Sequence, residues 1–535
     1  MAKKIAVIGA GASGLTAVKC CLDEDLELVC YERTESIGGL WYFTPEIRDG
    51  QGCINKSTVV NSSKEMMCFS DFPMPQEYPV FIHNTYVMKY LDLYAENFKL
   101  KKYIKFQTEV LHVSRADDFA QTGQWKVEIR DNKTGKQETK TFDGVLVCTG
   151  HLATQNIPHF KGMDEFAGDV IHSREYKRIE NYVDKRVLIV GTGNSGGDIA
   201  TELGQIASQV FLSTRRGTWV LNRVADNGMP FDMLLLSRFV GFLFWCMPTS
   251  LLNWVLERKL NQRFDHGLYS LKPNHGPLSQ APLINDDLPN RIVCGSVKIK
   301  TDVTRFTKTG VEFVDGTVED NIDSVILATG YVYGFPFLDK SVLNVNKNKV
   351  NLYKYVFPPD LERATLAVVG CIQPRGATMP ISEMQCRLAC RVFKGDVILP
   401  SRSDMWDDIR QKANSMSLHY VKSQRYTIQV DYVQIMDELA SLNGCKPNFY
   451  SLFLRDPRLA FSVAFGSCTP YQYRLQGPGC WDGACDAIRT QWDRTLYPLK
   501  TRPIASSQHS FQSKLLLYSI ALLFFAIIIK LFLSG

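Results

Sequence analysis

Two stretches of this sequence, 182 positions apart, repeat one pattern, a short apolar run that leads into a glycine-rich turn. The first occupies residues 3–14 (KKIAVIGAGASG) and the second occupies residues 185–196 (KRVLIVGTGNSG). In each copy the apolar run is typical of a buried β-strand, and the residues after the GxGxxG turn are compatible with a helix. The repeat therefore predicts an α/β chain with two Rossmann-like dinucleotide-binding domains.

The three glycines of such a turn have separate physical roles. The first permits the tight turn, and the second lets the backbone approach a pyrophosphate. The third lets the helix pack on the strand, so that the helix N-terminus faces the phosphates. We therefore predict cofactor contacts in both turns: Gly9, Gly11, Ser13 and Gly14 in the first, and Gly191, Gly193, Asn194, Ser195 and Gly196 in the second.

A second pair of matching segments lies at residues 142–150 (FDGVLVCTG) and 322–330 (IDSVILATG). Each is typical of a late strand that ends in small residues and closes one nucleotide domain, which adds Thr329 and Gly330 to the predicted contacts. One glycine cluster alone could be a strand–helix turn without a ligand. Two clusters with two closing strands favour a flavin enzyme, with one site for the resident cofactor and one for its reductant.

The two copies differ at the end of the second predicted strand. Glu32 stands 21 positions after Gly11, and its carboxylate can accept hydrogen bonds from ribose hydroxyls and would repel a 2′-phosphate. The same interval in the second copy leads to Thr214, which Arg215 and Arg216 follow. Paired guanidinium groups favour a doubly charged 2′-phosphate, although a solvated surface pair is the alternative. The first site is therefore predicted to hold FAD and the second NADPH.

Composition excludes several other classes. The chain has 535 residues, of which 45% are hydrophobic and 22% charged, so it is neither disordered nor a coiled coil. A net charge of +6 is too dilute for a nucleic-acid partner. The 15 cysteines are scattered through the chain and are expected to be reduced thiols facing the cytosol. No zinc-ligand spacing occurs, so no metal site is predicted.

The C-terminal segment is predicted to be a membrane anchor. From Leu515 to Leu533 the residues are apolar except Ser519 and Lys530, and 19 residues of helix span about 28 Å, close to the thickness of the hydrocarbon core. Lys530 can extend toward a headgroup. A buried or interfacial helix is the alternative. With an anchor at 513–535 and no signal peptide upstream, the body of the chain is expected to face the cytosol.

Several motifs resemble those of the flavin-containing monooxygenases. The segment before the second glycine turn fits the FxGxxxHSxxY fingerprint of that family, and further matches lie near both turns: residues 166–176 (FAGDVIHSREY), 328–331 (ATGY), 38–41 (GGLW) and 61–66 (NSSKEM). Residues 285–289 (NDDLP) look most like form five of the vertebrate enzymes. The resemblance covers essentially the whole chain. It implies an endoplasmic reticulum enzyme whose Gly39, Leu40 and Trp41 contact FAD.

The resemblance also implies a reaction. NADPH reduces FAD, the reduced flavin captures O₂ as a C4a-hydroperoxide, and this species oxygenates a soft nitrogen or sulfur atom of a small molecule. The protein then needs no nucleophile of its own. By resemblance Asn61 and Asn194 are the catalytic residues. The alternatives are that Asn61 is only a turn residue, that Asn194 caps a helix, and that His172 of the fingerprint is structural.

Five departures from the family pattern leave other outcomes open: Asn55, Arg375, Leu388, Cys480 and Cys485. A changed charge or a lost aromatic ring near the flavin could alter the substrate or shorten the life of the peroxide. One alternative is therefore Baeyer–Villiger oxygenation of ketones or mainly NADPH oxidase activity that releases H₂O₂. Another is a membrane-tethered nucleotide-binding protein with impaired catalysis. The oligomeric state also stays open, with a homo-oligomer among the options.

The expected domain plan follows from the repeat. Residues 1–154 form the first part of the FAD domain, and residues 155–330 form the NADPH domain with a helical insertion at about 217–295. Residues 331–445 complete the FAD domain, and residues 446–512 form a C-terminal cap before the anchor. Within the insertion, residues 239–252 are rich in Phe, Leu, Trp and Met, which favours either a buried helix or a surface that contacts a membrane or substrate channel.

Overall fold

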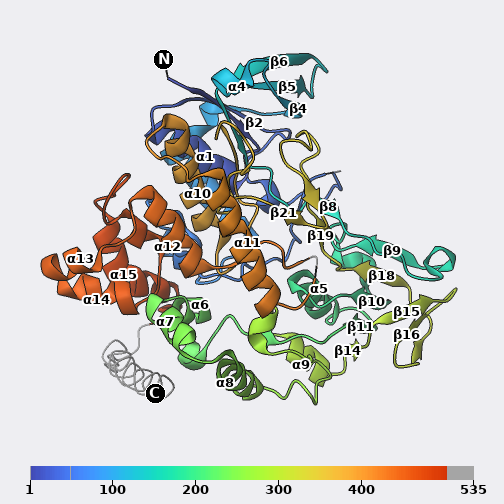
Figure 1. Ribbon diagram of the computed structural model, residues 1–535. Coiled ribbons are helices and arrows are strands. Elements are labelled where there is room, and N and C mark those ends of the chain that lie inside the picture. Colours follow the sequence, from blue (N-terminus) through green and yellow to red (C-terminus); the bar gives the residue numbers. More distant parts are fainter. Residues whose placement is uncertain (1, 49, 424, 503–535) are drawn as a thin grey trace.

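Two five-stranded parallel sheets organise the protein (Figure 1). The computed structural model describes residues 2–48, 50–423 and 425–502. The first sheet has the order β22-β7-β1-β2-β3, with β1 at Lys4–Ile8, β2 at Glu27–Tyr31, β3 at Ile104–Lys105, β7 at Gly144–Val147 and β22 at Leu366–Val368. The second has the order β14-β11-β10-β18-β9, with β9 at Asp169–His172, β10 at Arg186–Val190, β11 at Gln209–Ser213, β14 at Val297–Lys300 and β18 at Ser324–Leu327.

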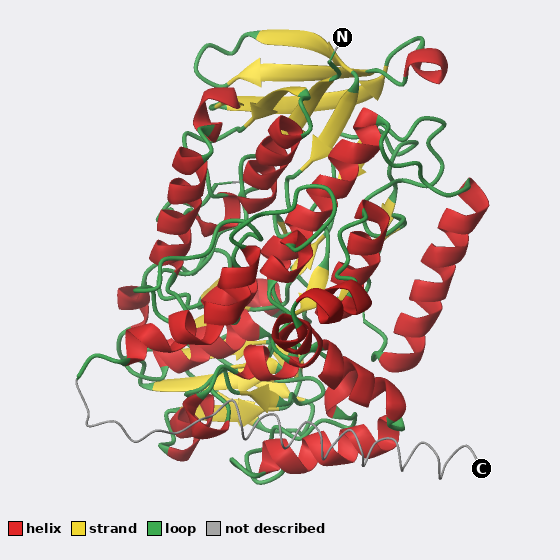
Figure 2. Ribbon diagram, turned by 90° about the vertical axis from the view of Figure 1, so that its left-hand side faces the viewer, coloured by secondary structure: helices red, strands yellow, loops and turns green. Residues whose placement is uncertain are grey.

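The repeat in the sequence is a repeat in the fold. In both copies a central strand pairs with the next strand on one side and with the closing strand on the other, β1 with β2 and β7, and β10 with β11 and β18. A three-stranded antiparallel sheet precedes each closing strand, formed by β4 (Thr108–Arg115), β5 (Trp125–Asp131) and β6 (Gln137–Phe142) in the first copy and by β15 (Val303–Phe306), β16 (Val311–Phe313) and β17 (Val318–Glu319) in the second. Figure 2 shows the first of these antiparallel sheets at the top of the molecule.

Alternating side chains of the central strands fill the two faces of each parallel sheet. We call the parts of the protein built around the first and the second parallel sheet the first body and the second body. In β10, Val187 and Ile189 belong to one apolar cluster of the second body, whereas Leu188 and Val190 belong to another. Because successive side chains of a strand point to opposite faces, a continuous apolar run such as VLIV is what a sheet covered on both faces requires.

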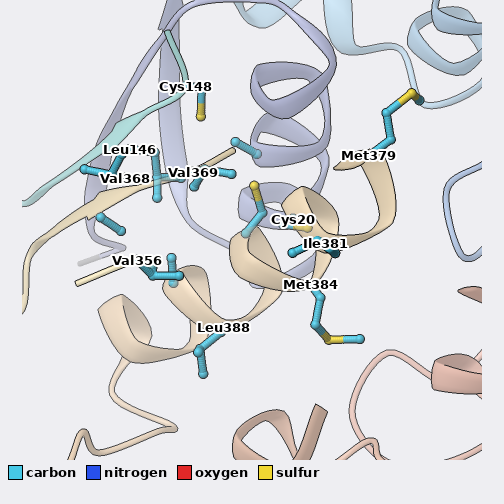
Figure 3. Packing of buried hydrophobic residues seen from close by; sticks show 14 of the residues in the cluster. Cys20, Leu146, Cys148, Val356, Val368, Val369, Met379, Ile381, Met384 and Leu388 are labelled. Atoms are coloured by element: carbon cyan, nitrogen blue, oxygen red, sulfur yellow. The ribbon is translucent and has the colours of Figure 1, made fainter. Parts of the chain in front are cut away.

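The chain returns to the first sheet after it has built the second. Strand β22 pairs with β7, and helix α10 (Thr378–Lys394) packs along α1 (Ala12–Asp23). Figure 3 shows Ile381 of α10 close to Cys20 of α1, with Cys148 and Leu146 beyond, whereas Met384 points away from α1. The sulfur of Met384 instead accepts from Asn443 at 3.3 Å. Segments that lie more than 350 residues apart in sequence therefore share one hydrophobic core.

The apolar segment 239–252 of the insertion does not form one continuous helix. Helix α6 covers Phe231–Leu235, α7 covers Arg238–Cys246, α8 covers Thr249–Asn261 and α9 covers Leu288–Val293. Pro248 precedes the first residue of α8, and since proline has no N–H to continue α7, the segment breaks there. Phe239 and Leu243 are buried, but Phe242 is 42% exposed and Trp245 is 72% exposed. The expectation of a buried helix is therefore right for one side of α7 only.

The C-terminal helices extend the first body (Figure 1). Their bounds are Arg402–His419 for α11, Tyr432–Asn443 for α12, Phe449–Arg455 for α13, Pro457–Phe465 for α14 and Ala484–Leu496 for α15. Leu439, Val463 and Ile488, from α12, α14 and α15, join the core of the first sheet. The predicted anchor at 513–535 lies outside the described residues. Within residues 2–48, 50–423 and 425–502, no helix has the length and apolar character that crossing a bilayer requires.

Close backbone contact explains the third glycine of each turn. A Cβ atom on Gly14 would lie 1.8 Å from the carbonyl oxygen of Gly9, and one on Gly196 would lie 2.0 Å from that of Gly191. Gly9 and Gly191 have φ values of +95° and +111°, which side chains disfavour. The strand and the helix can therefore meet this closely only through glycine.

We expect Gly14→Ala to force α1 away from β1 and to lower both the thermal stability and the FAD content of the purified protein. The control is Gly241→Ala on α7, where a Cβ meets nothing within 4 Å. Since alanine is favoured over glycine in a helix by about 1 kcal/mol, the control should be neutral or slightly stabilising. A Gly14→Ala protein with unchanged melting temperature and flavin content would contradict this reading of the turn.

Candidate functional site

The first glycine turn is completed by a second loop that lies against it. Gly11 is the N-cap of α1, and the N–H of Gly38 donates to the carbonyl oxygen of Ala10 at 3.0 Å. A Cβ on Gly39 would lie 3.0 Å from the Cα of Gly11, so these two backbones touch. The short helix Gly39–Trp41 follows at once. The structure thus brings the predicted contacts Gly39, Leu40 and Trp41 beside the first turn.

Glu32 lies at the end of β2 with its carboxylate turned back to the same turn. Its Oε2 accepts a hydrogen bond from the N–H of Ala10 at 2.7 Å, and its Oε1 accepts from the N–H of Thr34 at 2.9 Å and from the Thr34 hydroxyl at 2.8 Å. The side chain is buried. The carboxylate is therefore oriented where a ribose beside this turn would meet it.

The second turn has no carboxylate at the matching place. Thr214 follows β11, and its hydroxyl lies 3.1 Å from that of Thr192 inside the turn. Arg215 and Arg216 are exposed, and Nη1 of Arg216 donates to the carbonyl oxygen of Lys422 at 3.4 Å. The two turns have the same backbone form but opposite charge beside them, which fits two nucleotides that differ by a 2′-phosphate.

The closing strand of the second sheet ends at the connection between the two bodies. Thr329 donates its hydroxyl hydrogen to the carbonyl oxygen of Asn156 at 2.6 Å. Nε2 of His172 lies 3.0 Å from the carbonyl oxygen of Gly330, and Nδ1 accepts from the N–H of Arg174. These partners fix a neutral ring with its hydrogen on Nε2, and burial lowers its pKa. His172 is thus a buried structural residue that holds the backbone at Gly330.

Asn194 is the first residue of α5 (Asn194–Leu203), and Gly193 is its N-cap. The amide oxygen Oδ1 of Asn194 accepts a hydrogen bond from the N–H of Ile284 in the insertion at 3.0 Å. The side chain does not cap the helix, which was one alternative for this residue. Its orientation is instead fixed by the insertion.

Asn61 lies in a loop of the first body, and its amide oxygen is buried without a hydrogen-bond partner in the described part of the chain. Such an atom costs free energy unless a bound group supplies a donor. The unpaired Oδ1 of Asn61 therefore supports a binding site for a cofactor or a substrate at this loop.

Two residues of the insertion hold the Asn61 loop. Oδ2 of Asp232 accepts hydrogen bonds from the N–H of Ser63 at 2.6 Å and from its hydroxyl at 3.0 Å. Nε of Arg223 donates to the carbonyl oxygen of Val60 at 3.2 Å. The second body thus positions a loop of the first, and Asn61 lies between these two points of attachment.

One short segment of the insertion connects both asparagines. Arg223 forms an ion pair of 2.8 Å with Asp286, two residues beyond the Ile284 whose N–H holds Asn194. Arg223, Asp232 and Asp286 were not among the sequence-predicted site residues, because their contacts join segments that lie far apart in the chain. The only related signal was the likeness of residues 285–289 to one form of the family.

The five departures from the family pattern do not form one group. The backbone of Asn55 accepts from Asn84 close to the Asn61 loop, and Arg375 stacks on Tyr420 with 4.8 Å from guanidinium to ring centre. Leu388 is buried in α10, Cys480 is exposed and Cys485 is partly buried. In the part of the chain that the structure describes, no three His, Cys, Asp or Glu side chains gather as metal ligands.

Asp232 gives the site a measurable pH dependence. Complete burial raises the pKa of its carboxyl to about 6, although hydrogen bonds from Ser63 oppose the shift. An acid with a raised folded-state pKa stabilises the fold below its unfolded pKa, and this stabilisation is lost as the pH rises through 6. We expect the free energy of unfolding of the wild type, relative to Asp232→Asn, to fall by about 2 kcal/mol between pH 4.5 and 6.5.

Urea unfolding at several pH values measures this difference. Asp226→Asn removes an exposed carboxylate of the same insertion and controls for the loss of one charge. If the difference in free energy of unfolding between the wild type and Asp232→Asn stayed constant across this pH range, the raised pKa of Asp232 would be contradicted.

Comparison with known proteins places this geometry in a family. The family model described as flavin-binding monooxygenase-like matches residues 2–532. Flavin-containing monooxygenase 5 from Homo sapiens is 53% identical over 534 residues, which cover 99% of each chain. Dimethylaniline monooxygenase (N-oxide-forming) 2 from Macaca mulatta is 48% identical over 531 residues, covering 98% of this chain and 99% of that protein.

Solved structures of lower identity share the architecture. S-allyl-L-cysteine S-oxygenase from Allium sativum superimposes with a TM-score of 0.64 at 23% identity, covering 93% of this chain and 99% of that one. Cyclohexanone monooxygenase from Rhodococcus sp. Phi1 gives a TM-score of 0.57 at 16% identity, covering 82% and 97%. These likenesses confirm the predicted α/β fold with two Rossmann-like domains.

Proposed function

The chain belongs to the flavin-binding monooxygenase-like family and is an oxidoreductase that uses FAD, NADPH and O₂, and we propose that it oxygenates soft nitrogen or sulfur atoms of small molecules. The observation that carries the proposal is the 48% identity, over 98% of the chain, to a relative whose name states N-oxide formation. A lone pair on nitrogen or sulfur attacks electrophilic oxygen directly, so the protein has to position and protect the reactants and needs no nucleophile of its own.

The two glycine turns are the proposed cofactor sites. FAD lies at the first turn, with Glu32 at its ribose and the Gly39–Trp41 loop beside it. NADPH lies at the second turn, where Arg215 and Arg216 meet its 2′-phosphate. In this proposal residues 1–154 and 331–445 form the FAD domain, residues 155–330 form the NADPH domain with its insertion at 217–295, and residues 446–512 form the cap. The fused core of β22, α10 and α1 supports the first of these assignments.

The reduced flavin supplies the oxygen-activating chemistry when it is bound. Asn61 and Asn194 are proposed to hold the reactants with their side-chain amides, which can donate and accept hydrogen bonds without giving up a proton. Because Oδ1 of Asn194 already accepts from Ile284, its NH₂ group can donate to a reactant. The buried Oδ1 of Asn61 can accept a hydrogen bond from a reactant. The Arg223 and Asp232 contacts keep the Asn61 loop in place.

Product analysis tests the proposed reaction. The purified enzyme, supplied with NADPH and O₂, is incubated separately with a tertiary amine, a thioether and a ketone. We expect the amine to give an N-oxide or the thioether to give a sulfoxide, with nearly one mole of product formed per mole of NADPH consumed. Ester from the ketone alone would establish the Baeyer–Villiger alternative, and H₂O₂ as the main product with all three would establish the oxidase alternative.

Substitution of Asn61 tests its role. We expect Asn61→Ala to retain FAD and to be reduced by NADPH, while oxygenated product falls at least tenfold and H₂O₂ rises in proportion, because the reactive oxygen is no longer held. Asn414→Ala, at an exposed position of α11, is the matched control and should leave both products unchanged. An Asn61→Ala enzyme with the wild-type ratio of product to H₂O₂ would remove Asn61 from the chemistry.

We also propose that a single C-terminal helix at 513–535 anchors the enzyme in the endoplasmic reticulum membrane, with the catalytic body in the cytosol. Exposed aromatic residues on α7 and α8 support a membrane nearby, since Trp245 and Trp254 are 72% and 59% exposed. In Figure 1, α7 and α8 lie next to each other at one end of the molecule, below α14.

Truncation after Ser513 tests the anchor. We expect the shortened enzyme to move from the membrane pellet to the supernatant after cell fractionation and to keep its FAD. If it still pelleted, and adding Trp245→Ser and Trp254→Ser released it, the surface of α7 and α8 would be the main attachment and the anchor proposal would be wrong.

A further inference from the structure

An arginine from a distant part of the chain lies against the second glycine turn. A Cβ atom on Gly193 would lie 3.2 Å from Nη1 and 3.6 Å from Nη2 of Arg425. At the matching position of the first turn, the three atoms nearest to a Cβ on Gly11 would be backbone atoms of Gly38 and Gly39, at 3.5 Å or more. The second glycine of such a turn is the place where the backbone approaches a pyrophosphate. The Arg425 guanidinium therefore borders the space that the phosphates of the second nucleotide need.

Within the part of the chain that the structure describes, the Arg425 guanidinium has no anionic partner. Arg425 is half-buried; its guanidinium lies 5.7 Å from the ring centre of Tyr426 and is close enough to Tyr333 to interact with it electrostatically. The guanidinium makes no hydrogen bond or ion pair with any residue in 2–48, 50–423 or 425–502, and only the backbone N–H of Arg425 is bonded, to the hydroxyl of Ser423. A partly desolvated cation without a partner is costly, and a phosphate matches the two parallel N–H groups of a guanidinium.

The helix that starts at the same glycine adds a second source of positive potential. Helix α5 runs for ten residues from Asn194 to Leu203, and no side chain caps its N-terminus. Its first backbone N–H groups are therefore free to bind an anion, and the helix dipole favours one. Arg425 and the start of α5 face the same turn from two different parts of the chain.

The segment that carries Arg425 is docked on the second body. The N–H of Val421 donates to the carbonyl oxygen of Ser279 at 3.0 Å, and the carbonyl oxygen of Lys422 accepts from Arg216 at 3.4 Å. Directly after Arg425 the chain returns to the first body, because Ile428 is buried in its core. Arg425 thus reaches the second turn from the body that contains the first.

We propose that Arg425 binds the pyrophosphate of the nucleotide at the second turn and completes that site from the first body. This rests on the proposed assignment of NADPH to the second turn. Arg215 and Arg216 recognise the 2′-phosphate, whereas Arg425 recognises the diphosphate bridge. Binding of the nucleotide at Arg425 therefore also joins the two bodies.

Calorimetric titration of the FAD-loaded enzyme with two probes separates these roles. NADP⁺ carries both the pyrophosphate and the 2′-phosphate, whereas 2′-AMP carries only the latter. Loss of a charge-assisted contact costs roughly 10- to 100-fold in affinity. We expect Arg425→Gln to weaken NADP⁺ by this factor and to leave 2′-AMP unchanged, and Arg425→Lys to weaken NADP⁺ less. We expect Arg215→Gln to weaken both probes.

Arg410→Gln is the matched control, since Arg410 is an exposed arginine on α11 that pairs only with Asp407 in the described structure. Unchanged NADP⁺ affinity in Arg425→Gln, with Arg215→Gln weakened as expected, would overturn the role of Arg425 alone. An Arg425→Gln enzyme weakened equally for both probes would assign Arg425 to the 2′-phosphate and also overturn the proposal. If Arg215→Gln changed neither probe, the assignment of NADPH to this turn would fail instead. Flavin absorbance and melting temperature of each variant show that it is folded.

Discussion

The contact between the third glycine of each turn and the carbonyl oxygen of the first is the constraint on which the rest of the structure depends. It occurs twice, at Gly14 with Gly9 and at Gly196 with Gly191, and in both places a methyl group would overlap the backbone. Because strand and helix meet so closely, the helix N-terminus is held at the carboxyl edge of the sheet, where a phosphate can reach it. Each body repeats this unit, and we propose that the charge beside the turn distinguishes the two nucleotides.

The proposed reaction centre belongs to neither body alone. The loop of Asn61 comes from the first body but is held by Arg223 and Asp232 of the insertion in the second. Asn194 opens a helix of the second body and is held by Ile284 of the same insertion. An enzyme that passes electrons from one bound nucleotide to another needs both in a fixed relation. Contacts of the insertion link the loops of Asn61 and Asn194. The insertion thereby connects the proposed NADPH site at the second turn with Asn61, which is proposed to hold the reactive oxygen.

The local parts of this architecture could be predicted from sequence, since they rest on short-range patterns. The central strand of each sheet, the strand that follows it, the glycine turns, the closing strands and the position of Glu32 all follow from residue type and spacing. The position of β22 and α10 on the first sheet is a long-range contact, and no local pattern specifies it. The break at Pro248 was missed because the apolar composition continues across it. Arg223, Asp232 and Arg425 act on backbone groups or turns more than 150 residues away, so only the folded chain brings them into view.

If both nucleotide sites are as proposed, one purified chain holds a flavin and accepts electrons from NADPH. Anaerobic mixing of the enzyme with one equivalent of NADPH, followed by flavin absorbance, tests this most directly. We expect a yellow protein whose flavin absorbance is lost on the addition of NADPH, and much more slowly on the addition of the same amount of NADH. A protein that is colourless after incubation with FAD, or a bound flavin that NADPH leaves oxidised, would contradict it.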